Sequence, residues 1–221
     1  MQRKIPFLEG EYYHLYNRGV DKRNIFSSTS DYKRFMALLY LSNNDGDVRI
    51  DNIFRSSTLE EILTQERGNP LVALGAFCLM PNHFHLLATP LVKNGLSRYM
   101  LKLQTGYSMY FNIKNKRSGS LFQGPFKGTH AGEDRYLKYL FSYIHLNPTK
   151  LKDQHWKEKT YQRNSPLTKF VEHYPYSSLG AYLTGKHSIT NPKPFPQYFS
   201  SKREAVAHVR EWLEADVNEI Q

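Results

Sequence analysis

The chain has 221 residues, 40% of them hydrophobic and 14% aromatic, and this composition excludes a globally disordered protein. Its formal net charge of +10 favours an acidic partner, most commonly a nucleic acid. The single cysteine, Cys78, excludes an internal disulfide. No apolar run approaches the roughly 18 residues of a membrane span, and the first residues lack the apolar stretch of a signal peptide. We therefore expect a cytoplasmic protein without a membrane partner.

The first third of the chain alternates between strand and helix signals. An aromatic-rich segment predicts a strand over residues 12–20. A helix is predicted over 27–44, because apolar residues recur there at helical spacing behind a cap at Ser30 or Asp31. A short helix fits residues 58–66 of the polar segment that follows.

The middle of the chain is more regular. The predicted elements are, in order, two strands over 71–81 and 83–90, a long helix over 95–116, a strand over 119–132 broken by Gly and Pro, and a helix over 133–148. This order predicts an α+β fold, a ferredoxin- or RRM-like antiparallel sheet with helices on one face. We expect residues 1–150 to form this domain, and residues 151–221 to form an irregular and helical extension, ending in an amphipathic helix over 201–217, that packs on the domain or contacts DNA.

A long acid-free stretch interrupts an otherwise even distribution of carboxylates. No Asp or Glu occurs between Glu66 and Glu133. The basic residues of this window are Arg67, Lys93, Arg98, Lys102, Lys114, Lys116, Arg117 and Lys127, together with three histidines. Such a window is typical of a surface that faces phosphate, although chance clustering of solvated lysines gives the same pattern.

Two of these histidines lie at alternate positions of a predicted strand. Side chains alternate across a strand, so His83 and His85 project from the same face, whereas Phe84 and Leu86 point into the core. Two imidazoles on one face can converge on one metal ion. They can equally be ordinary polar residues of a solvated sheet, and the pair alone is a weak motif.

The helix over 133–148 carries a second candidate group. An apolar stripe suits docking to the sheet, and beside it Tyr139, Tyr143 and Asn147 follow one another at a spacing of four. A phenol and a carboxamide therefore lie on one ridge near the helix end. Taken singly, the tyrosines are more typical of packing, and an Asn before Pro is more typical of a helix stop.

Taken together, "MPNHFHLL" and "YIHLNP" resemble the paired signatures of single-tyrosine transposases of the HUH endonuclease superfamily. The similarity is closest to the REP-associated tyrosine transposases, relatives of the small insertion-sequence transposases. It extends to "YYHLYNRGVDKRNIF", "SLFQGPFKG" and "YPYSSLGAYL", and so covers roughly residues 10 to 185. The chain departs from the expected pattern at Pro125, where a basic residue is expected.

The resemblance implies a role for each matching residue. It implies that Tyr143 is the nucleophile, and that His83, His85 and Asn147 bind a divalent cation, Mg²⁺ or Mn²⁺, with open positions for phosphate and water. It further implies a transposase-like endonuclease and strand transferase that acts on single-stranded or hairpin DNA through a 5′-phosphotyrosine, in a prokaryotic nucleoid. A monomer is slightly favoured over a homodimer.

Further residues are candidate DNA contacts. They are His14, Arg18, Arg98, Lys102, Lys114, Lys116, Arg117 and Lys127. Other functions remain open on the sequence: a non-catalytic hairpin-binding protein, an RNA-binding module of the same sheet topology, and a relaxase or replication initiator, which the small size disfavours.

Overall fold

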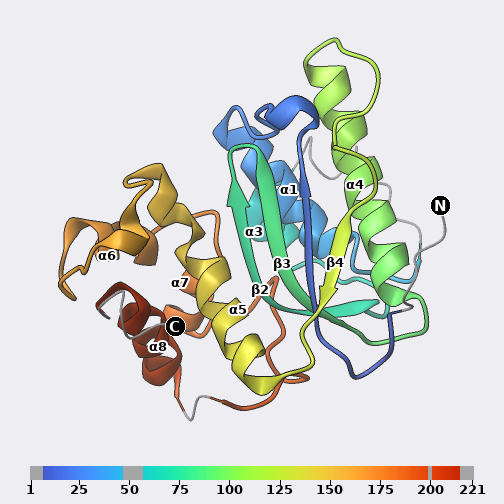
Figure 1. Ribbon diagram of the computed structural model, residues 1–221. Helices are drawn as coiled ribbons and strands as arrows, with labels where there is room; N and C mark the ends of the chain where they lie inside the picture. Colours follow the sequence, from blue (N-terminus) through green and yellow to red (C-terminus); the bar gives the residue numbers. More distant parts are fainter. Residues whose placement is uncertain (1–6, 47–56, 199–200, 215–221) are drawn as a thin grey trace.

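The computed structural model describes residues 7–46, 57–198 and 201–214. Its strands are β1 (Tyr13–Arg18), β2 (Val72–Met80), β3 (His83–Pro90) and β4 (Lys127–His130). Its helices are α1 (Thr29–Leu41), α3 (Leu59–Ile62), α4 (Gly95–Lys114), α5 (Asp134–Leu146), α6 (Pro166–Glu172), α7 (Leu179–Thr184) and α8 (Lys202–Glu214). Short 3-10 segments cover Val20–Lys22, Asn147–Leu151 and Trp156–Glu158 (Figure 1).

The four strands form one antiparallel sheet in the order β2-β3-β1-β4, which confirms the predicted α+β class. The register between the two central strands pairs Arg18 with His83 and Tyr16 with His85. The sheet thus brings the first strand of the chain directly beside the histidine pair, although about 65 residues separate them in sequence.

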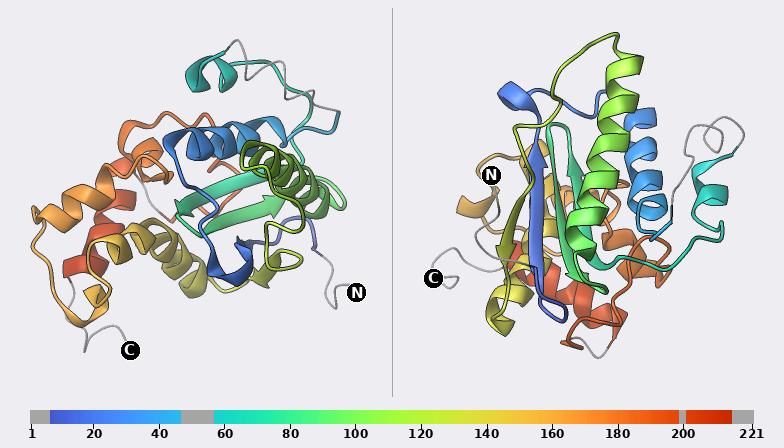
Figure 2. Two further views of the ribbon diagram at one scale, coloured as in Figure 1. Left: turned by 90° about the horizontal axis from the view of Figure 1, so that it is seen from above. Right: turned by 90° about the vertical axis from the view of Figure 1, so that its right-hand side faces the viewer.

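Helices cover both faces of the sheet, not one as the sequence analysis expects. In Figure 2, α1 and α4 lie on one side of the sheet and α5 lies on the other. Alternation along β3 explains this, because Phe84 and Leu86 enter the core under α1 and α4, while Leu87 joins the core under α5. Each face of the sheet carries buried apolar side chains, so each needs a covering layer.

A β-bulge at Gly75 determines which residues of β2 point toward α5. The pairing of β2 with β3 shifts between Leu74 and Ala76, and beyond the shift Ala76 and Cys78 belong to the core under α5. A Cβ atom at Gly75 would lie 2.9 Å from the ring of Phe195, so the close approach of that ring requires glycine here.

The predicted N-cap of α1 and the predicted extent of the fourth strand are wrong. Helix α1 begins at Thr29 with Ser28 as its N-cap, and Asp31 occupies the third helical position, where its carboxylate completes the capping box. The strand predicted over 119–132 is ordered as a strand only in β4, because Gly124 has a φ of +75° and Pro125 follows it.

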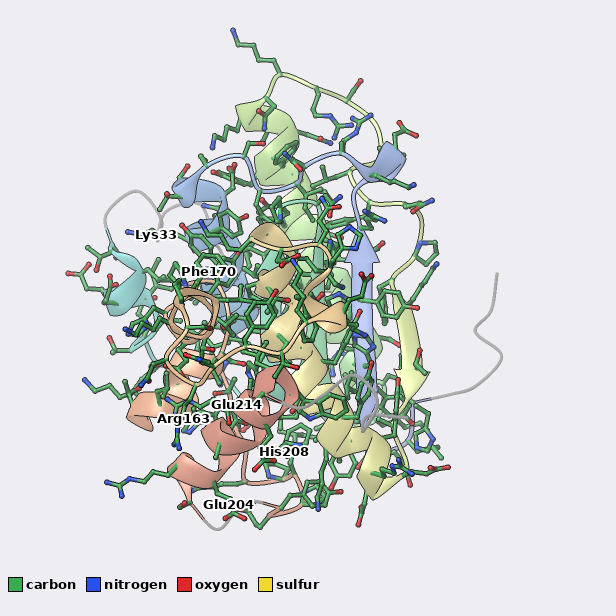
Figure 3. All side chains as sticks on the ribbon, turned by 60° about the vertical axis from the view of Figure 1, so that its left-hand side comes forward. Lys33, Arg163, Phe170, Glu204, His208 and Glu214 are labelled. Carbon is green, nitrogen blue, oxygen red and sulfur yellow. The ribbon has the colours of Figure 1, made fainter. Side chains whose placement is uncertain are left out.

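The described part of the C-terminal extension packs on the sheet. Ser177 bridges to Cys78 on the edge strand β2, and α6 and α8 contribute Leu167, Val171 and Val209 to the core shared with α5. Figure 3 shows this region with Phe170 and His208 labelled. None of the helices in the described ranges has the length and apolar character that a bilayer crossing requires.

Candidate active site

The histidine pair lies on the face of β3 that α5 covers. The ring centroids of His83 and His85 are 5.0 Å apart with an interplanar angle of 86°, so both imidazoles project from the same side of the strand. Phe84, between them, is fully buried on the opposite side. Strand alternation therefore produces the predicted convergence.

Each imidazole is oriented through its Nδ1 atom. The Nδ1 of His83 lies 2.6 Å from Oδ1 of Asn82, and the Nδ1 of His85 lies 2.8 Å from Nε2 of His14. The Asn82 oxygen can only accept, so Nδ1 of His83 carries the proton and its Nε2 carries a lone pair. Within the described part of the chain, neither Nε2 has a hydrogen-bond partner. This arrangement is typical of histidines that are held ready to bind a metal.

Helix α5 brings Tyr143 to the same place. The half-buried Tyr143 ring lies 5.5 Å from the His85 ring and 6.0 Å from the His14 ring, both edge to face. Burial raises the pKa of Tyr143, Tyr139 raises it further, and the Asn147 side chain acts in the opposite direction. The phenol is thus protonated at neutral pH before any cation or substrate approaches.

Asn147 follows α5 on the same ridge and is 1% exposed. Its Nδ2 donates a hydrogen bond of 2.8 Å to the backbone oxygen of Tyr143. Its Oδ1 accepts a hydrogen bond of 3.3 Å from Nζ of Lys150. The two hydrogen bonds hold the carboxamide in one orientation, with its oxygen toward the ammonium group of Lys150.

Lys150 was not among the residues singled out from the sequence. It lies in the 3-10 segment Asn147–Leu151, three residues after Asn147, and its Nζ is 5.4 Å from the centroid of the Tyr143 ring. The signal for it is local, because residues three apart on a helical turn are neighbours. The sequence alone could therefore have identified Lys150 as a neighbour of Asn147, because it is a basic residue three positions later.

The site keeps its imidazoles neutral. Burial lowers the pKa of His14 and of His83 to about 4, and the charges of Arg18 and Lys150 lower that of His83 further. Burial also lowers the pKa of His85 well below its usual value, and its neighbours His14 and His83 add to the effect. Neutral imidazoles are the form that binds metal ions.

The donor set fits a divalent cation only in part. Among the described residues, no group of three or more His, Cys, Asp or Glu side chains is placed to hold a metal ion. Two imidazole nitrogens and the Asn147 oxygen remain, and all three are neutral. Such a set suits a cation whose remaining ligands, including a charged one, come from phosphate and water.

The candidate DNA contacts fall into two groups. Arg18 lies beside His83, with a buried Nε that has no hydrogen-bond partner, and Lys127 is exposed on the edge strand β4. His14 lies on β1, where its ring contacts that of His85. The remaining five belong to α4 and the turn after it. Arg98 and Lys102 donate to backbone oxygens of residues 44–46, and Arg117 donates to Asn112, whereas Lys116 is exposed. Helix α4 covers the face of the sheet opposite the histidines, so these residues lie away from Tyr143.

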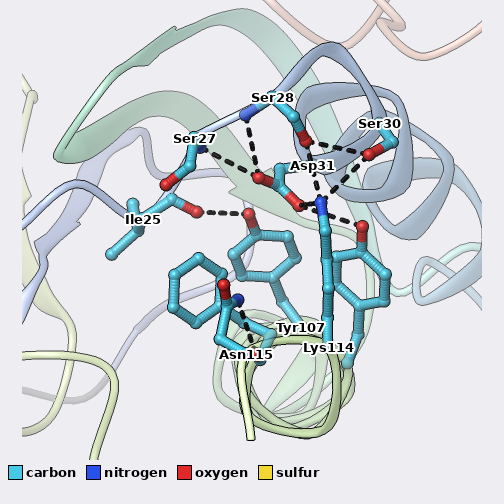
Figure 4. A network of polar contacts seen from close by, with 10 residues as sticks. Ile25, Ser27, Ser28, Ser30, Asp31, Tyr107, Lys114 and Asn115 are labelled. Carbon is cyan, nitrogen blue, oxygen red and sulfur yellow. Dashed lines mark hydrogen bonds and ion pairs between the residues drawn. The ribbon is translucent and has the colours of Figure 1, made fainter. Parts of the chain in front are cut away.

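Lys114 has a structural partner. Its Nζ lies 2.6 Å from Oδ1 of Asp31, a buried carboxylate that also accepts hydrogen bonds from the backbone of Ser27 and Ser28 and from the Tyr110 hydroxyl. Figure 4 shows this network at the start of α1. The ion pair joins α4 to α1, and a DNA contact by Lys114 stays a prediction.

Comparison with known proteins gives a family and a similar fold. The family model described as "Transposase IS200 like" matches residues 11–147, which include His83, His85, Tyr143 and Asn147. A solved structure of a REP-associated tyrosine transposase bound to a REP hairpin is similar in fold, with a TM-score of 0.52 and 12% sequence identity over 86% of this chain and 90% of that chain. No curated protein matches. Since the family model covers more than half of the sequence, the chain belongs to the IS200-like transposase family.

Proposed function

We propose that this protein is a metal-dependent endonuclease and strand transferase that acts on single-stranded DNA beside a hairpin through a 5′-phosphotyrosine. One observation carries the proposal: the Tyr143 ring lies 5.5 Å from His85 and shares its environment with His14 and Asn147. A tyrosine that serves only in packing has no need of neutral, oriented imidazoles on the facing strand.

The chemistry of the proposed step is a transesterification. The Tyr143 oxygen forms a bond to phosphorus, the bond from phosphorus to the 3′ oxygen breaks, and the released 3′ oxygen takes up a proton. The phenol proton passes to water. The number of phosphodiester bonds is unchanged, so a second 3′-hydroxyl can reverse the step and join a new strand without ATP.

His83, His85 and Asn147 would hold Mg²⁺ or Mn²⁺ beside Tyr143. The cation would stabilise charge on the phosphate and favour the phenolate. The chain's own contribution is orientation: Asn82 and His14 fix the two imidazoles, and the hydrogen bond to the Tyr143 backbone fixes the carboxamide.

Two observations support a DNA hairpin as the substrate. The similar fold belongs to a transposase bound to a REP hairpin, and the net charge of +10 favours a polyanion. A single-stranded flank is needed because the nucleophile has to reach a backbone that duplex geometry does not constrain. A monomer remains our expectation for the active form.

The test is adduct formation on a denaturing gel. A DNA hairpin with single-stranded flanks, taken from palindromes beside the gene and labelled at its 3′ end, is incubated with Mg²⁺ or Mn²⁺. We expect labelled DNA that migrates with the wild-type protein, because a 5′-phosphotyrosine stays on the downstream fragment.

The matched control is the tyrosine one turn earlier. Tyr139 stacks on Tyr143 with ring centroids 5.9 Å apart, so Tyr139→Phe should still form the adduct, whereas Tyr143→Phe should not. Hairpin binding by wild type without an adduct would favour the non-catalytic alternative. Equal binding of a matched RNA hairpin would favour an RNA-binding module.

A further inference from the structure

Lys150 reaches back over the candidate nucleophile. The 3-10 segment that contains it continues directly from α5, and its Nζ lies 3.3 Å from Oδ1 of Asn147 and 5.4 Å from the centroid of the Tyr143 ring. The ammonium group therefore contacts the carboxamide and lies over the Tyr143 ring. The residue is exposed, so a ligand in solution can reach it.

The charge of Lys150 is not neutralised by a carboxylate. In the described ranges of the chain it forms no ion pair, whereas other lysines do: Lys114 pairs with Asp31 and Lys159 pairs with Asp153. Its polar partner is a neutral amide oxygen. A positive charge placed in this way attracts an anion of the substrate.

A purely structural role explains the contact less well. A basic residue in the last turn of a helix commonly binds the free backbone carbonyls there. Lys150 instead donates to the side chain of Asn147, the residue expected to contact a cation in the loaded site. The ammonium thus places positive charge at the carboxamide oxygen that would contact the cation, 5.4 Å from the centroid of the Tyr143 ring.

We propose that Lys150 binds the phosphate group that Tyr143 attacks, and that its hydrogen bond to Asn147 belongs to the DNA-free state. This inference rests on the proposed function, since it takes the DNA phosphate beside Tyr143 as the ligand. A phosphate oxygen within reach of the ammonium would accept a charge-assisted hydrogen bond, which is stronger than the bond to the amide oxygen.

The test replaces charged phosphates one at a time. In the Tyr143→Phe background, which prevents cleavage, the affinity for the hairpin with single-stranded flanks is measured by fluorescence anisotropy, with an uncharged methylphosphonate at each flank position in turn. We expect one position where methylphosphonate weakens binding about tenfold when Lys150 is present and less than twofold in Lys150→Met. Lys150→Arg should restore most of the loss.

Lys152 provides the control. It is exposed and its Nζ lies 4.9 Å from the Phe170 ring, so Lys152→Met should leave the tenfold loss in place. If Lys150→Met does not fold, Lys150→Gln serves as the second variant, with the thermal transition of each checked. The inference is overturned if no position shows a Lys150-dependent loss. That result differs from failure of the proposed function, which appears as no adduct from wild type.

Discussion

Nε2 of His14 and Nδ1 of His85 lie 2.8 Å apart, and both side chains are more than nine-tenths buried. The bond crosses from β1 to β3, so it fixes the ring of a candidate metal ligand by a residue 71 positions earlier in the chain. Such partners commonly set the tautomer and direction of the ligand nitrogen.

The variant His14→Ala should therefore reduce the rate of adduct formation by about 10- to 100-fold, because His85 loses its orienting partner. Hairpin affinity should change less than twofold if His14 acts through His85. Single-turnover adduct kinetics and fluorescence anisotropy measure the two quantities. His173→Ala, at the exposed C-cap position of α6, is the control. An equal loss in affinity and rate would instead make His14 a DNA contact.

Replacing Asn147 tests whether its oxygen binds the cation. All the candidate ligands are neutral, so Asn147→Asp adds a negative charge and should raise the affinity of the DNA-free protein for Mn²⁺ at least several-fold. Asn147→Ala should lower it. Titration of Mn²⁺ followed by electron paramagnetic resonance measures free metal directly. If both variants bind Mn²⁺ as wild type does, Asn147 is not a ligand.

Local sequence patterns predicted the parts of the site that depend on local geometry. The common direction of His83 and His85 follows from strand alternation, and the ridge of Tyr143 and Asn147 follows from helical spacing. The apolar stripe of α5 correctly predicted that this helix docks on the sheet. The site forms where α5 docks on β3 and brings the Tyr143 ring beside the His85 ring.

Features that depend on long-range pairing were not predicted. An amphipathic pattern shows that a helix has a buried side, but not which face of the sheet it covers, so the placement of α5 opposite α4 was missed. The His14–His85 bond depends on the register of β1 against β3, which no local pattern encodes. Lys114 was predicted to contact DNA because its positive charge is evident from the sequence. Its ion-pair partner, Asp31, lies 83 residues away in the chain, and no local pattern predicts that contact.

Asp31 predicts a pH dependence of stability. Burial alone would raise the pKa of its carboxyl group, but hydrogen bonds from Lys114, Ser27 and other donors outweigh it, and the net result is a lowered pKa. As pH falls below about 4, the unfolded chain takes up a proton that the folded protein does not, so the stabilisation present at neutral pH is lost. Urea unfolding between pH 3 and 7 should show this loss.

Asp31→Asn should remove the loss of stability that the wild-type protein shows as pH falls below about 4. At pH 7 it should cost roughly 3 kcal/mol, because Lys114 loses its charged partner and two backbone N–H groups face an amide. Asp21→Asn, at an exposed carboxylate, should leave both the profile and the stability nearly unchanged. A wild-type profile in Asp31→Asn would show that the ion pair does not stabilise the junction of α1 and α4.

Ser178 links the C-terminal extension to the sheet. Its Oγ accepts a hydrogen bond of 2.9 Å from the backbone N–H of Phe77 on β2 and lies 2.7 Å from Nε2 of His145 on α5. Ser178→Ala leaves both partners buried without this hydroxyl, and we expect it to lower the free energy of unfolding by about 1 to 3 kcal/mol. Ser118→Ala, at an exposed serine, should change it by less than about 0.5 kcal/mol.

The same experiment tests whether residues 151–221 unfold separately. Both tryptophans, Trp156 and Trp212, lie in the extension, whereas circular dichroism reports on the whole chain. Because the core under α5 includes residues from both parts, we expect the fluorescence and circular dichroism transitions to coincide and Ser178→Ala to shift them together. Separate transitions, with only the fluorescence midpoint shifted by the substitution, would show that the extension is an independent unit.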